Sequence, residues 1–475
     1  MKNAIWKKGL VVGIILLIIG VSFSTSKQII ALQPEIVVGP YTQNVTNDSI
    51  TIAWETNIPA TNNSVEYGEN TDYGCIEYGP SGGRHHEITI YPPFTSGHYK
   101  VVSDGIESND FEFKLAGHCY STQEFKCVIF GDSRGVWDRW RHATEVANAV
   151  NAEHPDFVIH GGDMVNDGRV QTQWDSWLGL MKSLMQNSTV FGILGNHEYN
   201  GSRYYEIFAL PNNEMWYSFD YGPCHFTILD NYESWDVGSP QYEWLKDDLS
   251  SSMAPFKIVC FHEPIYCSGG HEPRTDVRAA WESLFNNYNV DLVFQSHNHY
   301  YQRTDPIKGI TYIVSGGAGA PLYTPEDAWF MNNSKKAYHY CVLDVSLVEM
   351  RMTCSARYTN GIAFDEFVVC PPTTPSVKII KPEKALYIFN KKIMPLSSTL
   401  IIGKIDIEVF ATDYKSGIDR VEFYIDGGYK GNDTSLPYEW TWDETIFGKH
   451  TINAIAYDNS GNTASDEQEV WIFNL

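Results

Sequence analysis

Histidine, aspartate and asparagine residues recur in this chain at one kind of place, directly after an apolar run. The segment "VFQSHNHYYQR" (293–303) begins as a buried strand and leads into two histidines, His297 and His299. On an extended chain residues i and i+2 point to the same face, so we expect both imidazoles to look into one space. Two imidazoles that share a space with no carboxylate between them favour a cation there. The pair therefore indicates part of a metal site.

Four further apolar runs lead into polar residues of the same kinds. They read "CVIFGDSRG", "FVIHGGDMVNDG", "GILGNHE" and "IVCFHEPIY". The candidate residues that they deliver are Asp132, Asp163, Asn196, His197 and His262. Ligand sites in open α/β sheets lie at the carboxyl ends of the strands, so we expect all five strand ends to converge on one rim. Placement at successive strand ends favours a metal site over unrelated turns and structural histidines.

The kinds of side chain limit which metal this site would hold. Carboxylate, amide and imidazole ligands without thiolate favour manganese, iron or zinc over Cu(I), and so many nitrogens disfavour Ca²⁺ or Mg²⁺ alone. The candidates are too many for one tetrahedral ion and enough for two ions that share a carboxylate. Two ions about 3.5–4 Å apart can clamp the attacking and leaving oxygens of an in-line displacement at phosphorus. We therefore expect two divalent or trivalent ions.

The elements that must position these residues lie between about 123 and 370. Apolar strands are predicted at 126–130, 156–160, 189–194, 256–261, 290–294 and 310–314. Amphipathic helices are predicted at 142–150, 172–185 and 276–285. Strands that are apolar throughout, separated by amphipathic helices, predict sheets buried beneath helices.

Two domains of short strands flank this part of the chain. Residues 34–118 and 376–475 alternate apolar and polar positions between Gly, Asn and Asp turns, which is typical of small β-sandwiches. The proline-rich residues 371–375 are predicted to be a stiff linker before the last domain. In that domain Trp440 and Trp442 fit two interpretations, exposed contacts for a sugar or alternating core residues.

The N-terminal residues 1–30 are predicted to be a signal peptide or, alternatively, a retained anchor. Three lysines, Lys2, Lys7 and Lys8, precede fifteen apolar residues, which is short for a helix that spans a membrane. In both cases the rest of the chain would be secreted or held at the cell surface. Nine cysteines are compatible with some disulfides there, with Cys119–Cys127 and Cys341–Cys354 as the candidate pairs.

The charge balance excludes one broad class of partner. The chain has 34 basic and 58 acidic residues, a net charge of −24. Such an excess counts against DNA, RNA or anionic lipid as a bulk partner. A phosphate-bearing ligand would need local positive charge that outweighs this field, and a metal cluster is one source of it.

The order GD, GGD, GNHE, HxPxY, HxH resembles that of the calcineurin-like metallophosphoesterases, and most of all their purple acid phosphatase branch. The resemblance covers residues 36–370 and includes "SVEYG", "FHEPIYCSGGHE", "VDLVFQSHNHYYQR" and "ITYIVSGGAG". It implies an α+β fold of αββα type, with two mixed β-sheets flanked by helices, over residues 123–370. It also implies a fibronectin III-like sandwich at 34–118. Residues 376–475 resemble the immunoglobulin-like modules of secreted microbial proteins.

The resemblance implies a ligand set for two ions. Asp163 would bridge them. The other ligands of the second ion would be Asn196, His262 and His297. Those of the first ion would be Asp132, His299 and the Asn166 carbonyl. His197 would donate to the phosphate or protonate the leaving oxygen, and His271 matches a histidine that lines the substrate pocket in this branch.

Two positions depart from the family pattern and weaken the first ion's site. Arg134 stands where many metallophosphoesterases have the histidine of a D-x-H motif, and Asn166 stands where purple enzymes have an iron-binding tyrosine. We expect a less tightly held first ion, poor stabilisation of Fe³⁺ and a colourless protein. Arg134 would either pair with Asp132 or another carboxylate as a structural ion pair or, as we favour, hold phosphate oxygens in a bidentate manner. Ser296 replaces the glycine usual before the first histidine of the pair.

We therefore expect an exported, dinuclear metal-dependent phosphoesterase that hydrolyses small phosphate monoesters by metal-hydroxide attack. One alternative is a phosphodiesterase or nucleotide hydrolase with the same cluster. Another is a non-catalytic surface-binding protein with a degenerate first metal site. For each of these functions the C-terminal domain would contact a cell surface or carbohydrate or would bind nothing, and the oligomeric state stays open.

Overall fold

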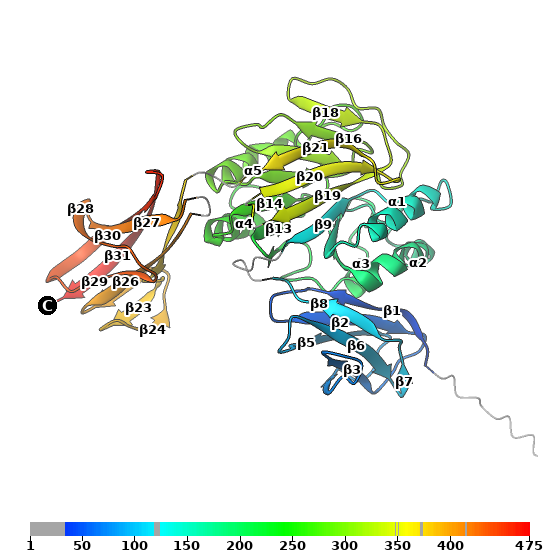
Figure 1. Ribbon diagram of the computed structural model, residues 1–475, viewed down its shortest axis with the longest axis horizontal. Coiled ribbons are helices and arrows are strands. Elements are labelled where there is room, and N and C mark those ends of the chain that lie inside the picture. Colours follow the sequence, from blue (N-terminus) through cyan, green and yellow to red (C-terminus); the bar gives the residue numbers. More distant parts are fainter. Residues whose placement is uncertain (1–33, 118–123, 347, 350, 371–373, 414–415) are drawn as a thin grey trace, which may run out of the picture. The chain divides into compact units, whose positions relative to one another are not determined.

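Figure 1 shows the computed structural model of the chain, which describes residues 34–117, 124–346, 348–349, 351–370, 374–413 and 416–475. The predicted signal or anchor segment 1–30, Cys119 and most of the predicted linker lie outside the described residues. Among the described residues no helix has the length and apolar character that crossing a bilayer requires.

The first described domain consists of two β-sheets. One contains β1 (Ile36–Gln43), β2 (Ile50–Thr56) and β5 (His85–Ile90). The other contains β3 (Asn63–Gly68), β4 (Cys75–Tyr78), β6 (Ser96–Ser103), β7 (Ile106–Glu107) and β8 (Phe111–Lys114). Trp54 is fully buried and its indole N–H donates to Ser103 Oγ at 2.9 Å, which links the two sheets. The predicted sandwich is present, and its fibronectin III-like type stays a prediction.

The central domain contains two mixed sheets. The first has the order β11 (Thr189–Gly192), β10 (Phe157–His160), β9 (Phe125–Phe130), β19 (His339–Ser346), β20 (Arg351–Tyr358), β21 (Ala363–Val369). The second has the order β12 (Tyr217–Tyr221), β13 (Cys224–Ile228), β14 (Phe256–Cys260), β15 (Leu292–Gln295), β17 (Thr311–Ser315), β16 (Tyr301–Thr304), β18 (Met331–Lys335). Strands β9–β11 pair in parallel, as do β13, β14, β15 and β17. All six predicted strands are confirmed.

Aromatic side chains from both sheets pack into one shared core. Phe191 of β11 stacks on Phe219 of β12 with ring centroids 3.8 Å apart, and Phe157 of β10 meets Phe226 of β13 edge-on at 5.2 Å. Because these contacts cross from one sheet to the other, the sheets lie face to face and their strand ends meet at a common edge.

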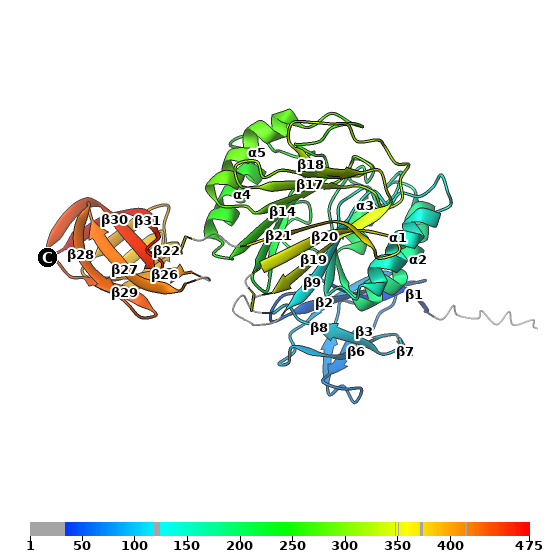
Figure 2. The same cartoon turned by 45° about the horizontal axis from the view of Figure 1, so that its top comes forward.

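Helices cover the outer faces of the two sheets (Figure 2). They are α1 (Arg141–Ala152), α2 (Gln171–Asn187), α3 (Ser202–Ile207), α4 (Pro240–Ser251) and α5 (Thr275–Asn287). On α2 the buried positions are those expected from the helical spacing, from Trp174 to Met185. On α4 the hydroxyl of Ser239 caps the helix by accepting the Tyr242 N–H, and Pro240 occupies the first turn. The predicted helices at 142–150, 172–185 and 276–285 are confirmed.

The last domain has its own core. Its sheets are β22 (Ser376–Lys381), β26 (Ile405–Thr412), β29 (Tyr438–Trp442) and, opposite, β24 (Lys391–Pro395), β23 (Ala385–Ile388), β25 (Thr399–Ile402), β31 (Thr463–Asn474), β30 (Ile446–Asp458), β27 (Ile418–Ile425), β28 (Gly428–Asp433). Trp442 is fully buried and Trp440 packs against the core. The sugar-contact interpretation is therefore wrong for Trp442, and the core interpretation holds.

The candidate disulfide between Cys341 and Cys354 does not form. Both thiols are free and buried on neighbouring strands, where Cys341 pairs with Ala356 and Cys354 with Leu343. The two cysteines are therefore not opposite each other in the pair of strands, because each faces a residue other than cysteine. Cys127 is also free, and Cys119, its candidate partner, lies outside the described residues.

A buried histidine in the second sheet makes the stability of this domain depend on pH. Burial lowers the pKa of His225, but its hydrogen bonds to Asp220 (2.7 Å) and Asp248 (3.0 Å) outweigh it and raise the pKa to about 9. We expect the charged ring to contribute about 3 kcal/mol, fully present below about pH 6.5 and lost as the pH rises through about 9.

The prediction is checked by thermal unfolding of the wild type and His225→Gln between pH 6 and pH 10. The gap between their melting temperatures should be largest at pH 6 and shrink towards pH 10. A gap that is constant with pH would contradict a charged His225.

Candidate metal centre

The site lies where the strands of both sheets end. Asp132 and Asp163 follow β9 and β10 of the first sheet, and His262 and His297 follow β14 and β15 of the second. Asp163 Oδ1 lies 3.4 Å from His262 Nε2, so residues about a hundred positions apart meet across the junction of the sheets.

The half of the site that was expected to hold the second ion, called the second half below, is a compact group of three ligand atoms. His297 Nδ1 lies 3.3 Å from His262 Nε2, and ligand atoms of Asp163, His262 and His297 all lie within 4.8 Å of one another. Asp163 and His262 are buried, and His297 is partly buried. His262 Nδ1 donates to the Gly161 carbonyl at 2.7 Å, which leaves Nε2 facing the other two. Such a group favours a metal ion or a proton between its ligand atoms.

The pKa values of His262 and His297 also indicate that positive charge is favoured between these ligand atoms. Burial lowers the pKa of His262, but the Asp163 charge and hydrogen bond outweigh it and raise that pKa to about 10. Burial and the neighbouring His262 lower the pKa of His297 to about 2, which keeps its imidazole neutral. A proton shared by Asp163 and His262 therefore occupies a position that also suits a metal ion.

The remaining residue expected in this half is Asn196. It follows Gly195, where the backbone passes very close to the Asp163 side chain. A Cβ at Gly195 would lie 2.3 Å from Asp163 Oδ1, so glycine is required there. The Tyr232 hydroxyl donates to Asn196 Oδ1 at 3.4 Å, which orients the amide.

The half of the site that was expected to hold the first ion, called the first half below, is centred on Asp132 and His299. Asp132 Oδ1 lies 3.5 Å from His299 Nε2 and has no hydrogen-bond donor. The second oxygen of Asp132, Oδ2, accepts the backbone N–H of His297 at 2.8 Å. His299 Nδ1 donates to the Pro321 carbonyl at 2.8 Å, which fixes its Nε2 as an acceptor that points into the site.

Arg134 reaches into this half and is almost completely buried. Its Nη2 lies 3.1 Å from His299 Nε2, and its Nη1 lies 2.5 Å from His197 Nε2. Its Nε lies 3.3 Å from Asp163 Oδ2 at an angle too poor for a hydrogen bond, so that contact is an ion pair only. No contact between Arg134 and Asp132 is formed by these atoms, and the carboxylate that it pairs with is Asp163.

His197 and Asn166 lie beside the guanidinium. The backbone N–H of His197 donates to Asp163 Oδ1 at 3.0 Å, and the ring Nδ1 of His197 donates to the backbone carbonyl of Asn166 at 2.7 Å. The side-chain oxygen of Asn166 accepts from Arg134 Nη1 at 3.3 Å. Both oxygens of Asn166 are therefore engaged by neighbours.

His271 and a tyrosine missed by the sequence analysis form one wall. The His271 ring lies 4.4 Å from the His297 ring and is exposed, and Tyr323 stacks on His299 at 4.2 Å. The Tyr323 hydroxyl lies 3.4 Å from His271 Nε2. Tyr323 follows no strand and belongs to no motif, so nothing local in the sequence marked it.

The backbone of the histidine pair differs from the expected extended chain. Strand β15 ends at Gln295, and His297 has a left-handed conformation with φ of 65°. The extended conformation predicted for the pair is therefore wrong. His297 lies beside His262 and Asp163, and His299 lies beside Asp132 and Arg134, so the two rings enter adjoining halves of one site. The Ser296 side chain packs against Gly131 and Gly161. A Cβ at either glycine would lie only 2.3 Å or 2.1 Å from the Ser296 Oγ, so neither position has room for a side chain.

Glu198, the last residue of the "GNHE" segment, supports the site although no function was predicted for it. It is fully buried, and its carboxylate accepts backbone N–H groups of Gly195 (2.7 Å), Met164 (2.8 Å) and Asp163 (2.9 Å). Burial and the nearby Asp163 charge raise the pKa of Glu198 to about 7. The side chain holds together the two turns that carry Asp163 and Asn196.

Removal of this carboxylate should loosen both turns. We expect Glu198→Ala to lower the free energy of unfolding by about 2–4 kcal/mol, because buried N–H groups lose their acceptor, and to weaken metal binding by about 10–100-fold. Calorimetry of unfolding and a metal titration measure the two effects. Glu366→Gln on the exposed face of β21 is the control, and equal behaviour of both variants would contradict this role.

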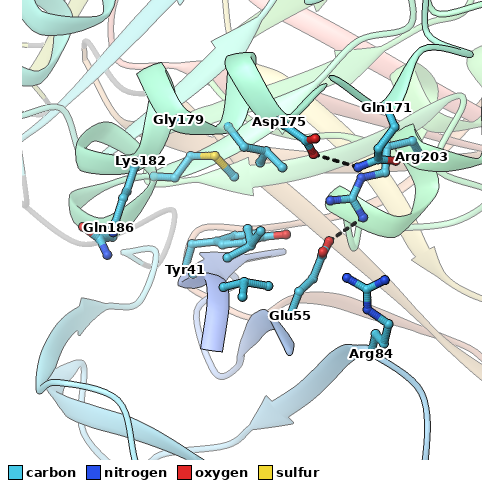
Figure 3. A pocket seen from close by; sticks show the side chains of 14 residues that line it. Tyr41, Glu55, Arg84, Gln171, Asp175, Gly179, Lys182, Gln186 and Arg203 are labelled. Carbon is cyan, nitrogen blue, oxygen red and sulfur yellow. Dashed lines mark hydrogen bonds and ion pairs between the residues drawn. The ribbon is translucent and has the colours of Figure 1, made fainter. Parts of the chain in front are cut away.

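A separate cavity of about 300 Å³ lies between β1 and α2 (Figure 3). Its wall includes an ion pair between Glu55 and Arg203, at 2.5 Å, and a hydrogen bond from Gln171 to Asp175. None of the predicted site residues lines it. The cavity is therefore a feature of the contact between the sandwich and α2, distinct from the metal centre.

Comparisons with known proteins relate the central segment of the chain to a family. Residues 125–301 match the calcineurin-like phosphoesterase family, and residues 391–454 match the bacterial Ig domain family. The central segment is a calcineurin-like phosphoesterase domain, and its homologues are purple acid phosphatases.

Two curated relatives illustrate the similarity. Purple acid phosphatase 13 of Arabidopsis thaliana is 26% identical over 326 residues, which cover 55% of this chain and 59% of the relative. Phosphoenolpyruvate phosphatase of Allium cepa is 24% identical over 311 residues, 58% of this chain and 64% of the relative. The chain thus spans less than two thirds of the length of either.

A solved structure shows the same fold. Purple acid phosphatase PPD1 from yellow lupin (Lupinus luteus) superposes with a TM-score of 0.63 at 20% identity, over 71% of this chain and 74% of that one. The central fold is therefore that of a metallophosphoesterase of the purple acid phosphatase kind, in a chain of mostly β content with a C-terminal bacterial Ig domain.

Proposed function

We propose that this protein hydrolyses phosphate monoesters outside the cytoplasm with the help of bound metal. The group of Asp163, His262 and His297 supports the proposal most directly, because three ligand atoms converge there beside a cationic side chain. The family match and the purple acid phosphatase relatives agree with this chemistry. The segment 1–30 as an export signal and the fibronectin III-like type of residues 34–118 belong to the same proposal.

The donor set fits a metal ion in the second half of the site. Asp163, His262 and His297 would hold it, with Asn196 as the fourth ligand. When bound, the ion would supply Lewis-acid stabilisation of negative charge and lower the pKa of water. The first ion of the expected pair would need Asp132, His299 and the Asn166 carbonyl, and Arg134 contacts His299 and Asn166.

The remaining residues would bind the phosphate and move one proton. Arg134 offers donors to phosphate oxygens, and its planar geometry favours a bidentate contact. His197 Nδ1 donates to the Asn166 carbonyl, so the proton for the leaving oxygen would have to be carried by Nε2, the atom that Arg134 Nη1 contacts in this structure. His271 and Tyr323 would line the substrate side of the pocket.

A panel of esters tests the proposed reaction. We expect the purified chain, supplied with Mn²⁺, Zn²⁺ or Fe²⁺, to hydrolyse p-nitrophenyl phosphate faster than its bis ester. His262→Ala should abolish turnover because it removes a buried ligand. A faster bis ester would favour the phosphodiesterase alternative, and no turnover of any ester would favour a binding protein.

The role of His197 predicts a dependence on the leaving group. We expect His197→Ala to lower kcat about 10²–10⁴-fold for an alkyl phosphate, whose leaving oxygen needs a proton. The loss should be much smaller for p-nitrophenyl phosphate, which leaves as a stable anion. His154→Ala, at an exposed position after α1, is the control. An equal loss for both esters would contradict proton delivery by His197.

The iron-loaded protein should be colourless. Asn166 stands where the purple enzymes have their iron-binding tyrosine, and burial raises the pKa of Tyr232, which keeps that nearby phenol neutral. Neither residue then supplies a phenolate ligand. An absorption spectrum after loading with iron checks this, and a visible charge-transfer band would overturn it.

A further inference from the structure

We propose that the guanidinium of Arg134 takes the place of the first metal ion, so that the site works with one metal ion and one cation fixed to the chain. The inference rests on the proposed function, because it concerns the same site, but it is read from metal content and needs no turnover. It departs from the pair of ions that the family resemblance implied.

The guanidinium contacts the residues that were expected to bind the first ion. Its nitrogens lie 3.1 Å from His299 Nε2, 3.3 Å from Asp163 Oδ2 and 3.3 Å from Asn166 Oδ1. Asp132, the fourth expected ligand, lies 3.5 Å from the same His299 nitrogen. The positive group thus lies among the ligand atoms and not at the outer edge of the site.

The hydrogen bond of His299 commits its lone pair to this cation. His299 Nδ1 donates to the Pro321 carbonyl, so its Nε2 is an acceptor. Arg134 Nη2 lies 3.1 Å from that atom. A lone pair that accepts an arginine N–H is not available to a metal ion at the same time.

A guanidinium excludes a metal ion from such a position on two grounds. It keeps its charge at every pH that a protein tolerates and has no acceptor atom, so it repels the ion and does not ligate it. It is also held in place, since Arg134 is only 8% exposed and its guanidinium lies 5.3 Å from the centre of the Trp137 ring.

The two halves of the site therefore differ in what they can bind. Among the residues that the structure describes, one group of three or more His, Cys, Asp or Glu side chains is close enough to share an ion, and it is Asp163, His262 and His297. The first half offers Asp132, His299 and the second oxygen of Asp163, and that oxygen is paired with Arg134. This asymmetry favours one metal ion.

The test counts metal ions in the wild type and in Arg134→His, which restores the D-x-H spacing. Each full-length protein is loaded with excess Mn²⁺, desalted and measured by elemental analysis. We expect about one ion per chain in the wild type and about two in Arg134→His. The electron paramagnetic resonance spectrum should change from that of an isolated Mn²⁺ to that of a coupled pair.

Two further variants keep the test decisive. Arg134→Gln removes the charge at similar size and should also gain a second ion, at lower affinity than Arg134→His, in case the latter does not fold. His262→Ala should lose the wild-type ion, which locates it in the second half. Two coupled ions in the wild type, or a single ion in both folded Arg134 variants, would overturn the proposal.

The outcome is separable from that of the proposed function. One ion per wild-type chain together with no hydrolysis of any ester would contradict the proposed reaction and support the role of Arg134. Two ions together with rapid hydrolysis would do the reverse.

Discussion

The structure depends on the cost of one buried charge, the Asp163 carboxylate. It is fully buried, and a carboxylate in that position is stable only with cations and hydrogen bonds around it. One oxygen accepts the His197 N–H and lies 3.4 Å from His262, and the other faces Arg134. Burial raises the pKa of Asp163, but these neighbours outweigh it and hold the pKa well below its usual range. The charge therefore persists and attracts a cation.

The two-sheet architecture is what brings those neighbours to Asp163. Its own strand, β10, belongs to one sheet, whereas His262 and His297 follow strands of the other. The aromatic contacts between Phe191 and Phe219 and between Phe157 and Phe226 fix the separation of the sheets. A packed core transmits small displacements, so these rings position the ligand atoms although they lie away from the chemistry.

The sequence predicted the features of this site that are local. An apolar run followed by Gly-Asp or by His is visible within a few residues, so Asp132, Asp163 and His262 were identified together with their strands. The left-handed backbone of His297 was missed, because φ of 65° is rare for a histidine and is imposed by the packing around it. The function of Glu198 was missed for a similar reason, since its partners are backbone N–H groups of two distant turns. No pattern of residue types encodes such contacts.

The presence of an arginine in the first half gives Asp132 a different role from the one expected. A carboxylate that ligates no ion would be costly to bury, yet Asp132 is fully buried. Its Oδ2 accepts the N–H of His297, the residue whose left-handed conformation directs its ring to His262. Asp132 thus supports the second half of the site from the first, and its charge lies 3.5 Å from the imidazole that Arg134 contacts. Asp132 and Arg134 carry opposite charges, and both contact the His299 imidazole. The backbone of His297, which donates to Asp132, therefore couples the two halves of the site.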